Sequence, residues 1–554
     1  MVPSRPVASF ELQFRHVFVI LFFGSTCIAL WQSFPLSSKD LWTHCKYGDW
    51  ISTQQHLPER EPFCAPADSA QEVTHTQWVS QVALHQVYRL GAWIAGGSEL
   101  NRLAGGVEML RLLLALLILA RMILLTIAFQ RVTRSLFWAL VALGVSLLIT
   151  WTNLIELRPH VVGEIFFAGL LMLVSRPIPS RVAVIIAPPL FVLWANCHAS
   201  FLGGFGLVAL LLAARFLDRA RAGLAISDLI TRDRRTQRLA LILVAGVIAT
   251  GFLNPHGWGL FDRILTVDGH PNGLALAEWQ PLRMEQSFGW HWIFLASMLL
   301  TVATHLQSRR GISAGDFLLL FSFAAAGCME QHMLVWWAIM LPWILAPHWC
   351  ERWPSPASKA DEPGVRRKGK ARATLLGAVL GLLVATTPTF SWMRSGRPAP
   401  LDQSLDTAPP WALCVQLQSE PSKETIAFPR LHAILRANYE GGRFRGKIMA
   451  SPSVGDFPLW RGLPVPVCSQ LYLFKAKYWT DQEFLLQCQP GWWETFDIQE
   501  VNMIILGPDE YRELRRRIEA ETGWEVIHRP GPLLDPRHGS FEGWVAVRKK
   551  PVAD

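Results

Sequence analysis

Hydrophobic runs recur along the first 390 residues, and each has about the length that a helix needs to cross a bilayer. The hydrocarbon core is about 30 Å thick, which a helix of about 20 apolar residues spans. The chain is therefore predicted to be a polytopic α-helical membrane protein. About eleven transmembrane helices are expected, at roughly 14–34, 106–129, 135–152, 160–175, 182–195, 199–216, 239–254, 289–305, 313–328, 332–349 and 374–390.

The hydrophobic pattern changes after about residue 391. Short β-branched and apolar segments bounded by Gly, Pro or Asp predict strands in GKIMASPSVGDF, VPVCSQLYLF, VNMIILG, WEVIH and GWVAVRKK. A helix with an acidic start and a glycine stop is predicted within GPDEYRELRRRIEAETG. We expect a transmembrane domain at 1–390, with a long first loop at 35–105, and a small α/β domain at 391–554.

Basic residues orient the predicted helices. With a cytoplasmic N-terminus, the inner connections hold 20 of the 32 Lys and Arg in residues 1–390, whereas the short outer connections hold Arg158, Arg263 and Arg283. Cytoplasmic loops of membrane proteins carry such an excess of basic residues. An odd number of spans then places the C-terminal domain outside the cytoplasm. A multi-pass protein of the inner (cell) membrane is the expectation.

Composition agrees with a membrane protein and argues against a nucleic-acid partner. Hydrophobic residues make up 51% of the chain and charged residues 17%, against roughly 25% charged in soluble domains. The net charge of +9 lies entirely in residues 1–390, because the remainder carries 20 basic and 20 acidic residues. Topology explains this excess, so membrane lipids are the expected partners and nucleic acid is not.

Polar and ionisable residues gather at the predicted outer ends of the helices. Such groups are costly at membrane depth and normally face a bundle interior or a wet cavity, where they mark function. Each alone has a simpler interpretation as a headgroup-level residue, but six separate segments deliver them to one side. The candidates are Asp40, His44, Arg158, His160, Glu164, Asn196, His198, Asn254, His256, Glu278 and His332.

The residue types narrow the chemistry of this predicted site. The chain has no GxGxxG after a strand, no GxxxxGK[ST], no HExxH and no CxxC, so ATP-driven and redox chemistry are not predicted. Asp40 is the candidate general base on an acceptor hydroxyl. Arg158 is expected to offset phosphate charge, and the histidines and Asn254 to bind sugar or phosphate oxygens. No metal site is predicted, although Asp40 with a nearby histidine could hold a divalent cation.

Other residues are expected to have structural roles. His160 and Glu164 are four apart and share a helix face. Arg111 and Arg121 are expected to snorkel or to pair within the bundle. Asp456, in SPSVGDF, is expected at a strand-to-turn position.

Several motifs resemble the GT-C superfamily of integral-membrane glycosyltransferases. Seven segments are similar to those of a group of bacterial GT-C-like proteins: DLWTHCKYGDWI, HLPEREPF, TQWVSQVALHQVYRLG, LRPH, WANCHASFLGG, NPHGW and EWQP. The resemblance covers nearly the whole chain and implies a polyprenyl-phosphate-linked sugar donor and a glycan, lipid or protein acceptor. It places Asp40 at the first-loop acidic position of the catalytic centre. Many GT-C enzymes have paired acidic residues there, whereas Leu41 follows Asp40 here, and Glu61 stands where the group usually has Asp.

Two alternatives remain open from the sequence. One is a transporter or lipid-handling protein, against which count the absence of a repeat and the clustering of polar groups at one rim. The other is a non-catalytic protein that keeps the GT-C scaffold. Cys45 and Cys64 share the first outer loop, and either a disulfide between them or two free thiols fits the sequence.

Overall fold

The computed structural model describes most of the membrane part and the centre of the C-terminal domain. In the first part it describes residues 23–27, 31, 35–36, 40–63, 75–150, 156–175, 180–224, 231–268, 279–285 and 289–353. In the second part it describes 405, 410, 413–414, 417, 439–440, 443–444, 447–451, 453–463, 465, 469, 476–494, 501–532, 540–541 and 543–549.

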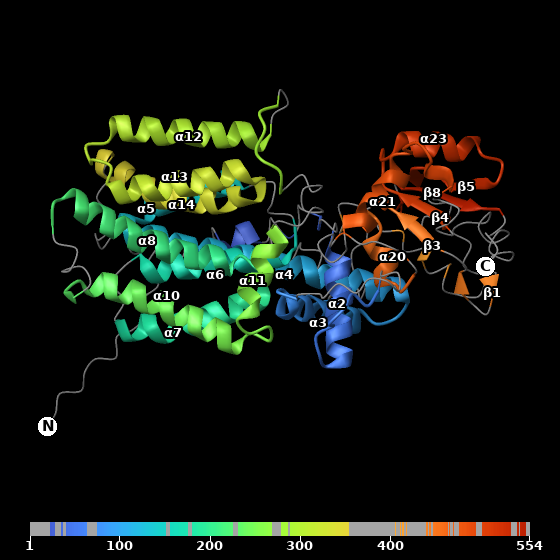
Figure 1. Cartoon of the computed structure of the whole chain (residues 1–554), viewed down its shortest axis with the longest axis horizontal. Coiled ribbons are helices and arrows are strands. Elements are labelled where there is room, and N and C mark those ends of the chain that lie inside the picture. The colour runs from blue at the N-terminus through green and yellow to red at the C-terminus, as the bar shows by residue number, and fades with distance from the viewer. Residues whose placement is uncertain are drawn as a thin grey trace, which may run out of the picture.

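A bundle of apolar helices forms the first part (Figure 1). Every predicted segment from 106–129 to 332–349 corresponds to a helix, and the boundaries agree within a few residues except where α4, α8 and α10 are longer. The helices are α4 (Glu99–Thr133), α5 (Leu136–Ile149), α6 (Pro159–Val174), α7 (Ser180–Cys197), α8 (Phe201–Arg221), α10 (Arg234–Leu253), α12 (Trp290–Gln307), α13 (Ala314–Met329) and α14 (Leu334–Arg352). The predicted span 374–390 and most of 14–34 lie outside the described residues, so the count of eleven stays a prediction.

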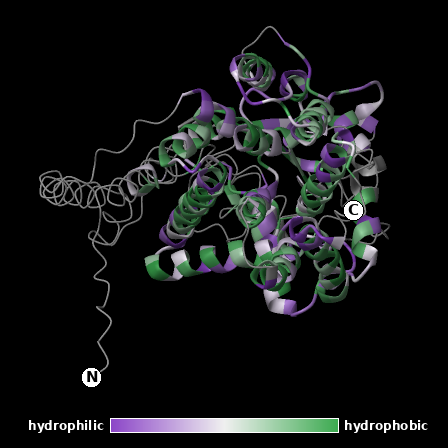
Figure 2. Ribbon diagram, turned by 90° about the vertical axis from the view of Figure 1, so that its left-hand side faces the viewer, coloured by the Kyte–Doolittle hydropathy of each residue, from purple (hydrophilic) through white to green (hydrophobic). Residues whose placement is uncertain are grey.

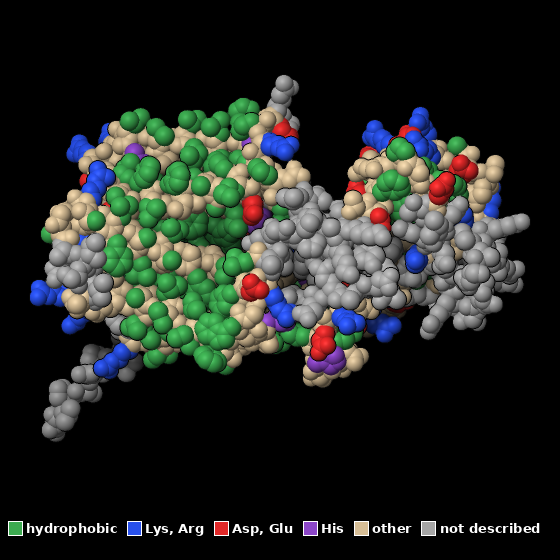
Figure 3. Space-filling view, viewed as in Figure 1, with side chains coloured by type: hydrophobic (Ala, Val, Ile, Leu, Met, Phe, Trp, Pro, Cys, Tyr) green, Lys and Arg blue, Asp and Glu red, His purple; other side chains and the backbone are tan. Residues whose placement is uncertain are grey.

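The bundle has the length and surface of a membrane domain. Among the described helices, α4, α8, α10 and the segment Gln331–Arg352 are long and apolar enough to cross a bilayer, and α5, α6, α7 and α13 are shorter apolar helices. Large apolar side chains cover its outside, where Phe252 is 73% and Leu306 81% exposed. Figure 2 shows that hydrophobic residues predominate along the helices of the bundle. Figure 3 shows apolar side chains over the outside of the bundle and Lys and Arg side chains at its left-hand end. Such a surface is costly in water and suits contact with lipid.

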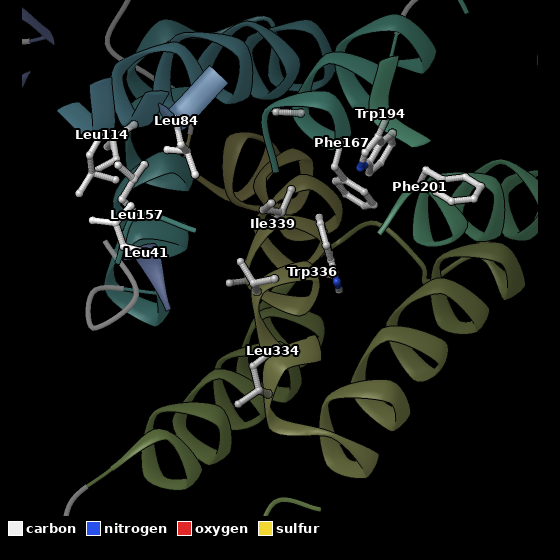
Figure 4. Close-up of a cluster of buried hydrophobic side chains, with 14 of the residues drawn as sticks. Leu41, Leu84, Leu114, Leu157, Phe167, Trp194, Phe201, Leu334, Trp336 and Ile339 are labelled. Atoms are coloured by element: carbon white, nitrogen blue, oxygen red, sulfur yellow. The ribbon is translucent and has the colours of Figure 1, made fainter. Parts of the chain in front are cut away.

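Helix α14 lies at the centre of the bundle and is buried along most of its length. Its Trp336 packs against Phe167 of α6, which in turn contacts Trp194 of α7 (Figure 4). Two tryptophans on α14 donate their indole N–H groups to hydroxyls of neighbouring elements: Trp337 donates to Ser297 at 2.8 Å and Trp343 to Ser175 at 2.9 Å. Buried indoles need such acceptors, so these bonds fix the register of α14 against α12 and α6.

The first loop is itself folded, which the sequence did not predict. It contains α2 (Leu41–Gln54) and α3 (Trp78–Ala95). The two helices approach so closely that a Cβ at Gly48 would lie 2.1 Å from the Gln81 carbonyl oxygen. The 35 residues of α4 span about 52 Å, more than the hydrocarbon core needs. Its N-terminal turns therefore extend beyond the apolar bundle and pack along α3.

A four-stranded sheet forms the centre of the C-terminal domain. Its order is β3 (Lys447–Ala450), β4 (Val501–Leu506), β8 (Trp544–Arg548) and β5 (Trp524–His528), with β3 parallel to β4 and the other pairs antiparallel. Alternate residues of β4 face opposite ways: Ile504 packs with α21 (Ala476–Leu486) and α23 (Arg512–Ala520), whereas Ile505 belongs to the larger hydrophobic core. The sheet is thus covered on both faces.

The prediction of these strands was partly right. VNMIILG, WEVIH and GWVAVRKK contain β4, β5 and β8, and α23 lies where a helix was predicted. Among the described residues of GKIMASPSVGDF, only Lys447–Ala450 form a strand, and Asp456 instead begins the short helix α20 (Asp456–Trp460). Most of VPVCSQLYLF lies outside the described residues. The structure also contains α11 (Gly259–Asp268), η4 (Gln331–Met333) and the short strands β1 (Tyr439–Glu440), β2 (Arg443–Phe444), β6 (Gly531–Pro532) and β7 (Ser540–Phe541).

Helix α20 joins the C-terminal domain to the first loop. The ring of Trp42, on α2, lies 4.9 Å from Phe457 and 4.8 Å from Trp460, measured between centroids. Lys46 Nζ donates to the Trp460 carbonyl oxygen at 3.2 Å, and Arg461 forms an ion pair with Glu99 at the start of α4. The C-terminal domain is therefore held against the first loop by a contact between aromatic rings, with polar contacts around it.

Replacing Trp42 by Ala should weaken this joint. Trp42 is 1% exposed, and truncating a buried Trp to Ala costs about 3–5 kcal/mol. We expect a lower unfolding temperature in detergent and faster proteolytic release of the C-terminal domain. Trp93→Ala is the control, because Trp93 on α3 is 79% exposed. Equal behaviour of the two variants would contradict the assignment of Trp42 to the joint.

Candidate active site

Asp40 lies where the first loop meets the membrane helices. It caps the N-terminus of α2, and its carbonyl oxygen accepts the His44 backbone N–H. Arg158, which precedes α6, donates from Nε to Asp40 Oδ1 at 3.1 Å, and His44 Nε2 lies 3.7 Å from Oδ2. The Asp40 and Arg158 side chains remain 21% and 17% exposed. The carboxylate is thus positioned by two side chains and still accessible.

The charge state of Asp40 follows from its neighbours. Burial raises the pKa of its carboxyl, but the Arg158 charge and the His44 hydrogen bond outweigh burial and hold the pKa well below its usual range. Asp40 is therefore an anion throughout the physiological pH range. Glu156, 3.6 Å from Arg158 Nε, adds a second carboxylate to the same guanidinium.

His160 and Glu164 share the first turns of α6, as predicted from their spacing. His160 Nε2 lies 3.7 Å from Glu164 Oε1. Glu164 is 1% exposed and forms an ion pair with Arg121 of α4, which also donates to Thr150 Oγ1 at 2.8 Å. Arg121 is therefore paired inside the bundle, as is Arg111, which donates to Glu108 at 2.8 Å.

His198, between α7 and α8, extends the histidine cluster. Its ring centroid lies 6.4 Å from that of His160. Burial, with smaller effects of His332 and His44, lowers the pKa of His198 to about 3. The ring is therefore neutral, and because Nδ1 accepts the Ser200 backbone N–H at 3.1 Å, the proton lies on Nε2. His332 is close enough to influence this pKa and lies 3.4 Å from Glu330.

The side chains of the two predicted asparagines, Asn196 and Asn254, form hydrogen bonds within the protein. Asn196 Oδ1 accepts from Trp78 Nε1 at 2.7 Å and from Asn254 Nδ2 at 3.1 Å, while its own Nδ2 donates to the Val192 carbonyl. Asn254 Oδ1 accepts the His256 backbone N–H at 2.9 Å. These bonds connect α3, α7 and the end of α10. The geometry gives both side chains a framework role, and their role in substrate binding stays a prediction.

His256 belongs to a second histidine cluster. In the contacts that the structure describes, its ring meets the backbone of His75 rather than Asp40. Burial, and to a smaller extent the Arg263 charge, lowers the pKa of His256, and burial lowers that of His75 to about 3. Glu278, the remaining predicted site residue, lies outside the described part of the chain. The structure therefore brings together Asp40, His44, Arg158, His160, Glu164 and His198.

Asp456 is a neighbour of the site that sequence reasoning placed in a turn. It is 2% exposed at the start of α20, where Oδ1 accepts the Ser469 backbone N–H at 2.9 Å and Oδ2 accepts the Ser469 hydroxyl at 2.5 Å. Burial, with a contribution from the Asp40 charge, raises its pKa to about 6, although hydrogen bonds from Ser469 and Thr43 oppose this. The acidic residue in SPSVGDF was visible in the sequence, but nothing local linked it to α2.

Metal-ligand side chains are sparse here. Within the described residues, no group of three or more His, Cys, Asp or Glu side chains is arranged to hold a metal ion. Asp40 and His44 offer two ligands. Cys45, on the same helix, is a buried free thiol, and burial raises its pKa to about 12. Of the two alternatives for this cysteine, the structure therefore contains the free thiol.

Comparison with known proteins gave structural neighbours only. No protein-family model matches the chain, and no curated protein matches its sequence. The solved structures that it resembles include the Archaeoglobus fulgidus oligosaccharyltransferase tethered to an acceptor peptide, at 13% identity over 88% of this chain and 68% of that one, with a TM-score of 0.49. Arabinofuranosyltransferase AftD from Mycobacteria is 15% identical over 97% of this chain and 42% of that one, with a TM-score of 0.48.

ArnT from Cupriavidus metallidurans, solved with bound undecaprenyl phosphate, is 12% identical over 96% of this chain and 98% of that one, with a TM-score of 0.43. These neighbours are GT-C glycosyltransferases, the superfamily that the sequence motifs resemble. With TM-scores below 0.5, the likeness does not by itself assign an activity to this chain.

A double-mutant cycle should show that Arg121 and Glu164 depend on each other. Removing one member of a buried ion pair leaves an uncompensated charge, which costs about 3–5 kcal/mol, whereas replacing both costs much less. We expect Arg121→Met and Glu164→Gln each to lower the unfolding temperature in detergent, and the double variant to lose far less than the sum. Simple additivity would show that the two side chains act independently.

Asp456 should make stability depend on pH. Because its folded pKa is raised, ionisation opposes folding, so stability falls as pH rises from about 4 through about 6. The loss is roughly 3 kcal/mol. We expect Asp456→Asn to unfold at a higher temperature than the wild type at pH 8, with the difference disappearing near pH 4. Asp509→Asn is the control, because the Asp509 side chain is 85% exposed; the same pH response in both would exclude Asp456 as the cause.

Proposed function

We propose that this protein is a membrane glycosyltransferase that transfers a sugar from a polyprenyl-phosphate-linked donor to an acceptor on the extracytoplasmic face. The observation that carries the proposal is the meeting of Asp40, from the first loop, with Arg158 and His160 at the ends of the apolar helices. An accessible carboxylate, a guanidinium and neutral imidazoles at a membrane edge suit a lipid-anchored anionic substrate.

Asp40 is the proposed general base. The acceptor hydroxyl oxygen forms a bond to the anomeric carbon of the donor sugar, and the bond from that carbon to the phosphate oxygen breaks. The hydroxyl proton passes to Asp40, and the polyprenyl phosphate leaves as an anion. Ordinary general-base catalysis of this kind contributes roughly 10²–10⁴-fold to a rate.

Arg158 is the proposed phosphate ligand and also controls Asp40. In the structure it donates to Asp40, which keeps the carboxylate a weak base. A donor phosphate would compete for the same guanidinium, because Arg binds phosphate oxygens bidentately. When Arg158 turns to the phosphate, Asp40 loses its counter-charge and its pKa rises. Donor binding would thus prepare the base, so that Asp40 is a weak base until the donor is bound.

The histidines are proposed to bind sugar or phosphate oxygens. The protonated Nε2 of neutral His198 can donate a hydrogen bond, and His160 stands beside it. Glu164 is buried and paired with Arg121, so we propose that it orients His160 rather than binding substrate. Asn196 and Asn254 are proposed to position α3 and α7 around the site. His44, His332 and a divalent cation held by Asp40 remain candidates for donor binding.

The proposed orientation places the N-terminus in the cytoplasm and the C-terminal domain outside, in the inner (cell) membrane. Arg131 at the end of α4 and Arg219 at the end of α8 mark one end of the bundle. Helix α2, which Asp40 precedes, lies at the other end, beside α20 of the C-terminal domain (Figure 1). This separation of basic residues from the site supports the orientation.

Asp40→Asn should abolish transfer and leave the protein folded. The amide cannot accept the hydroxyl proton, so we expect a loss of at least about 100-fold. The measurement is mass spectrometry of lipid-linked sugars and cell-envelope glycans in cells lacking the gene and complemented with each variant. Asp49→Asn, on the same helix with a side chain 52% exposed, is the control and should restore the wild-type glycans. Full complementation by Asp40→Asn would remove Asp40 as the base, and unchanged glycans after deletion would remove the proposed activity.

A further inference from the structure

A cavity of about 290 Å³ lies at the joint between the first loop and the C-terminal domain, separate from the residues around Asp40. Its walls come from three elements that are distant in sequence: α3, the N-terminal turns of α4, and α20. The volume is at the lower end of the roughly 300–1,000 Å³ typical of small-molecule sites. The cavity exists only because α20 is docked on α2 and α3.

The lining combines aromatic faces with charged hydrogen-bonding groups. Tyr88, Phe457 and Trp460 contribute rings, and Tyr88 and Trp460 are edge to face at 5.2 Å. The Tyr88 ring fits against Gly106 of α4, where a Cβ would lie 2.3 Å from it, so its position is fixed by packing. Glu99, Arg102 and Arg461 supply charges, and Arg461 is already ion-paired with Glu99.

This chemistry favours a carbohydrate over the other ligands of a membrane surface. Aromatic faces pack on the apolar faces of sugar rings, while guanidinium and carboxylate groups hydrogen-bond to hydroxyls. An anionic headgroup would meet the Glu99 carboxylate, which also neutralises one of the two arginines. An acyl chain would lie against charged side chains and form no hydrogen bond with them. A neutral glycan can pack on the aromatic rings and also form hydrogen bonds with the charged side chains.

The position of the cavity relative to Asp40 indicates which part of a glycan it would hold. Trp42, in the first turn of α2, packs on Tyr88, Phe457 and Trp460. Asp40 precedes that helix and contacts Arg158 and His44, neither of which lines the cavity. Helix α20 connects the two regions, because Asp456 lies against Thr43 while the next residues line the cavity. A glycan end held here would reach Asp40 only through further sugar units.

We propose that this cavity is an acceptor subsite that binds a neutral glycan through sugar rings remote from the reacting hydroxyl. The inference deepens the proposed function, because it identifies the acceptor as a carbohydrate chain. It also gives the C-terminal domain a role in substrate choice, since α20 forms one wall. Binding at this subsite does not require turnover and can be measured without it.

The test measures glycan binding to the full-length protein in detergent by saturation-transfer NMR. The probes are neutral hexasaccharides of α-1,4-glucose, β-1,4-glucose, β-1,4-N-acetylglucosamine, mannose and arabinofuranose at millimolar concentration. We expect at least one to bind, with longer chains better than disaccharides. Arg102→Ala and Trp460→Phe should each weaken binding about tenfold, because each removes one contact with the sugar. Arg89→Ala, next to Tyr88 but outside the cavity, should not.

The experiments can contradict the glycan subsite and the proposed transfer at Asp40 independently of each other. Asp40→Asn should bind the glycan like the wild type, and binding lost only in the cavity variants would support the subsite even if no transfer activity is found. Failure of every hexasaccharide to bind, or binding unchanged in Arg102→Ala and Trp460→Phe, would overturn the subsite and leave the proposed transfer standing. Trp460 also packs in the domain joint, so the unfolding temperature of each variant is recorded. Arg102, an exposed residue, keeps the test valid should Trp460→Phe misfold.

Discussion

The Asp40–Arg158 ion pair connects the folded first loop to the membrane bundle, and the geometry of the site depends on it. The two residues are 118 positions apart, yet their 3.1 Å contact fixes the start of α2 over the start of α6. At a membrane edge an uncompensated charge is expensive, so the two side chains hold each other in place. Because both side chains remain partly exposed, the same contact that holds the site together is available for exchange with a substrate phosphate.

Charge compensation continues into the bundle in the same manner. Glu164 is buried with Arg121, and Glu108 with Arg111, so carboxylates on α6 and α4 are balanced by arginines on α4. Polar contacts of the indoles on α14 add neutral links between helices. Lipid supplies no driving force between apolar helices, so such polar links and close packing determine which helices meet. The histidines beside Asp40 are held by this framework, and His198 stays neutral because the framework buries it.

The C-terminal domain is part of the same arrangement. Helix α20 packs on α2 through Trp42, and Asp456 is buried where it senses the Asp40 charge. Two acidic residues from opposite ends of the chain are thus neighbours, one ionised and one with a raised pKa. Different surroundings account for this difference: Asp40 has Arg158 and His44, whereas Asp456 has neutral hydroxyl and amide donors. Docking of the domain also forms the cavity proposed to hold a glycan.

The sequence by itself determined the helices α4 to α8, α10 and α12 to α14 and the strands β4, β5 and β8, and it indicated Asp40, Arg158, His160 and His198 as candidates. The length of an apolar run and the types of its residues are local properties, so a single segment of the sequence is enough to predict a helix or a strand. The tertiary structure alone decided that Asn196 and Asn254 bond to each other, that His256 lies with His75, and that Asp456 reaches α2. These outcomes depend on contacts between segments as much as 414 residues apart, as for Lys46 and Trp460. Such contacts depend on how whole helices and strands pack together, which cannot be predicted from any single segment of the sequence.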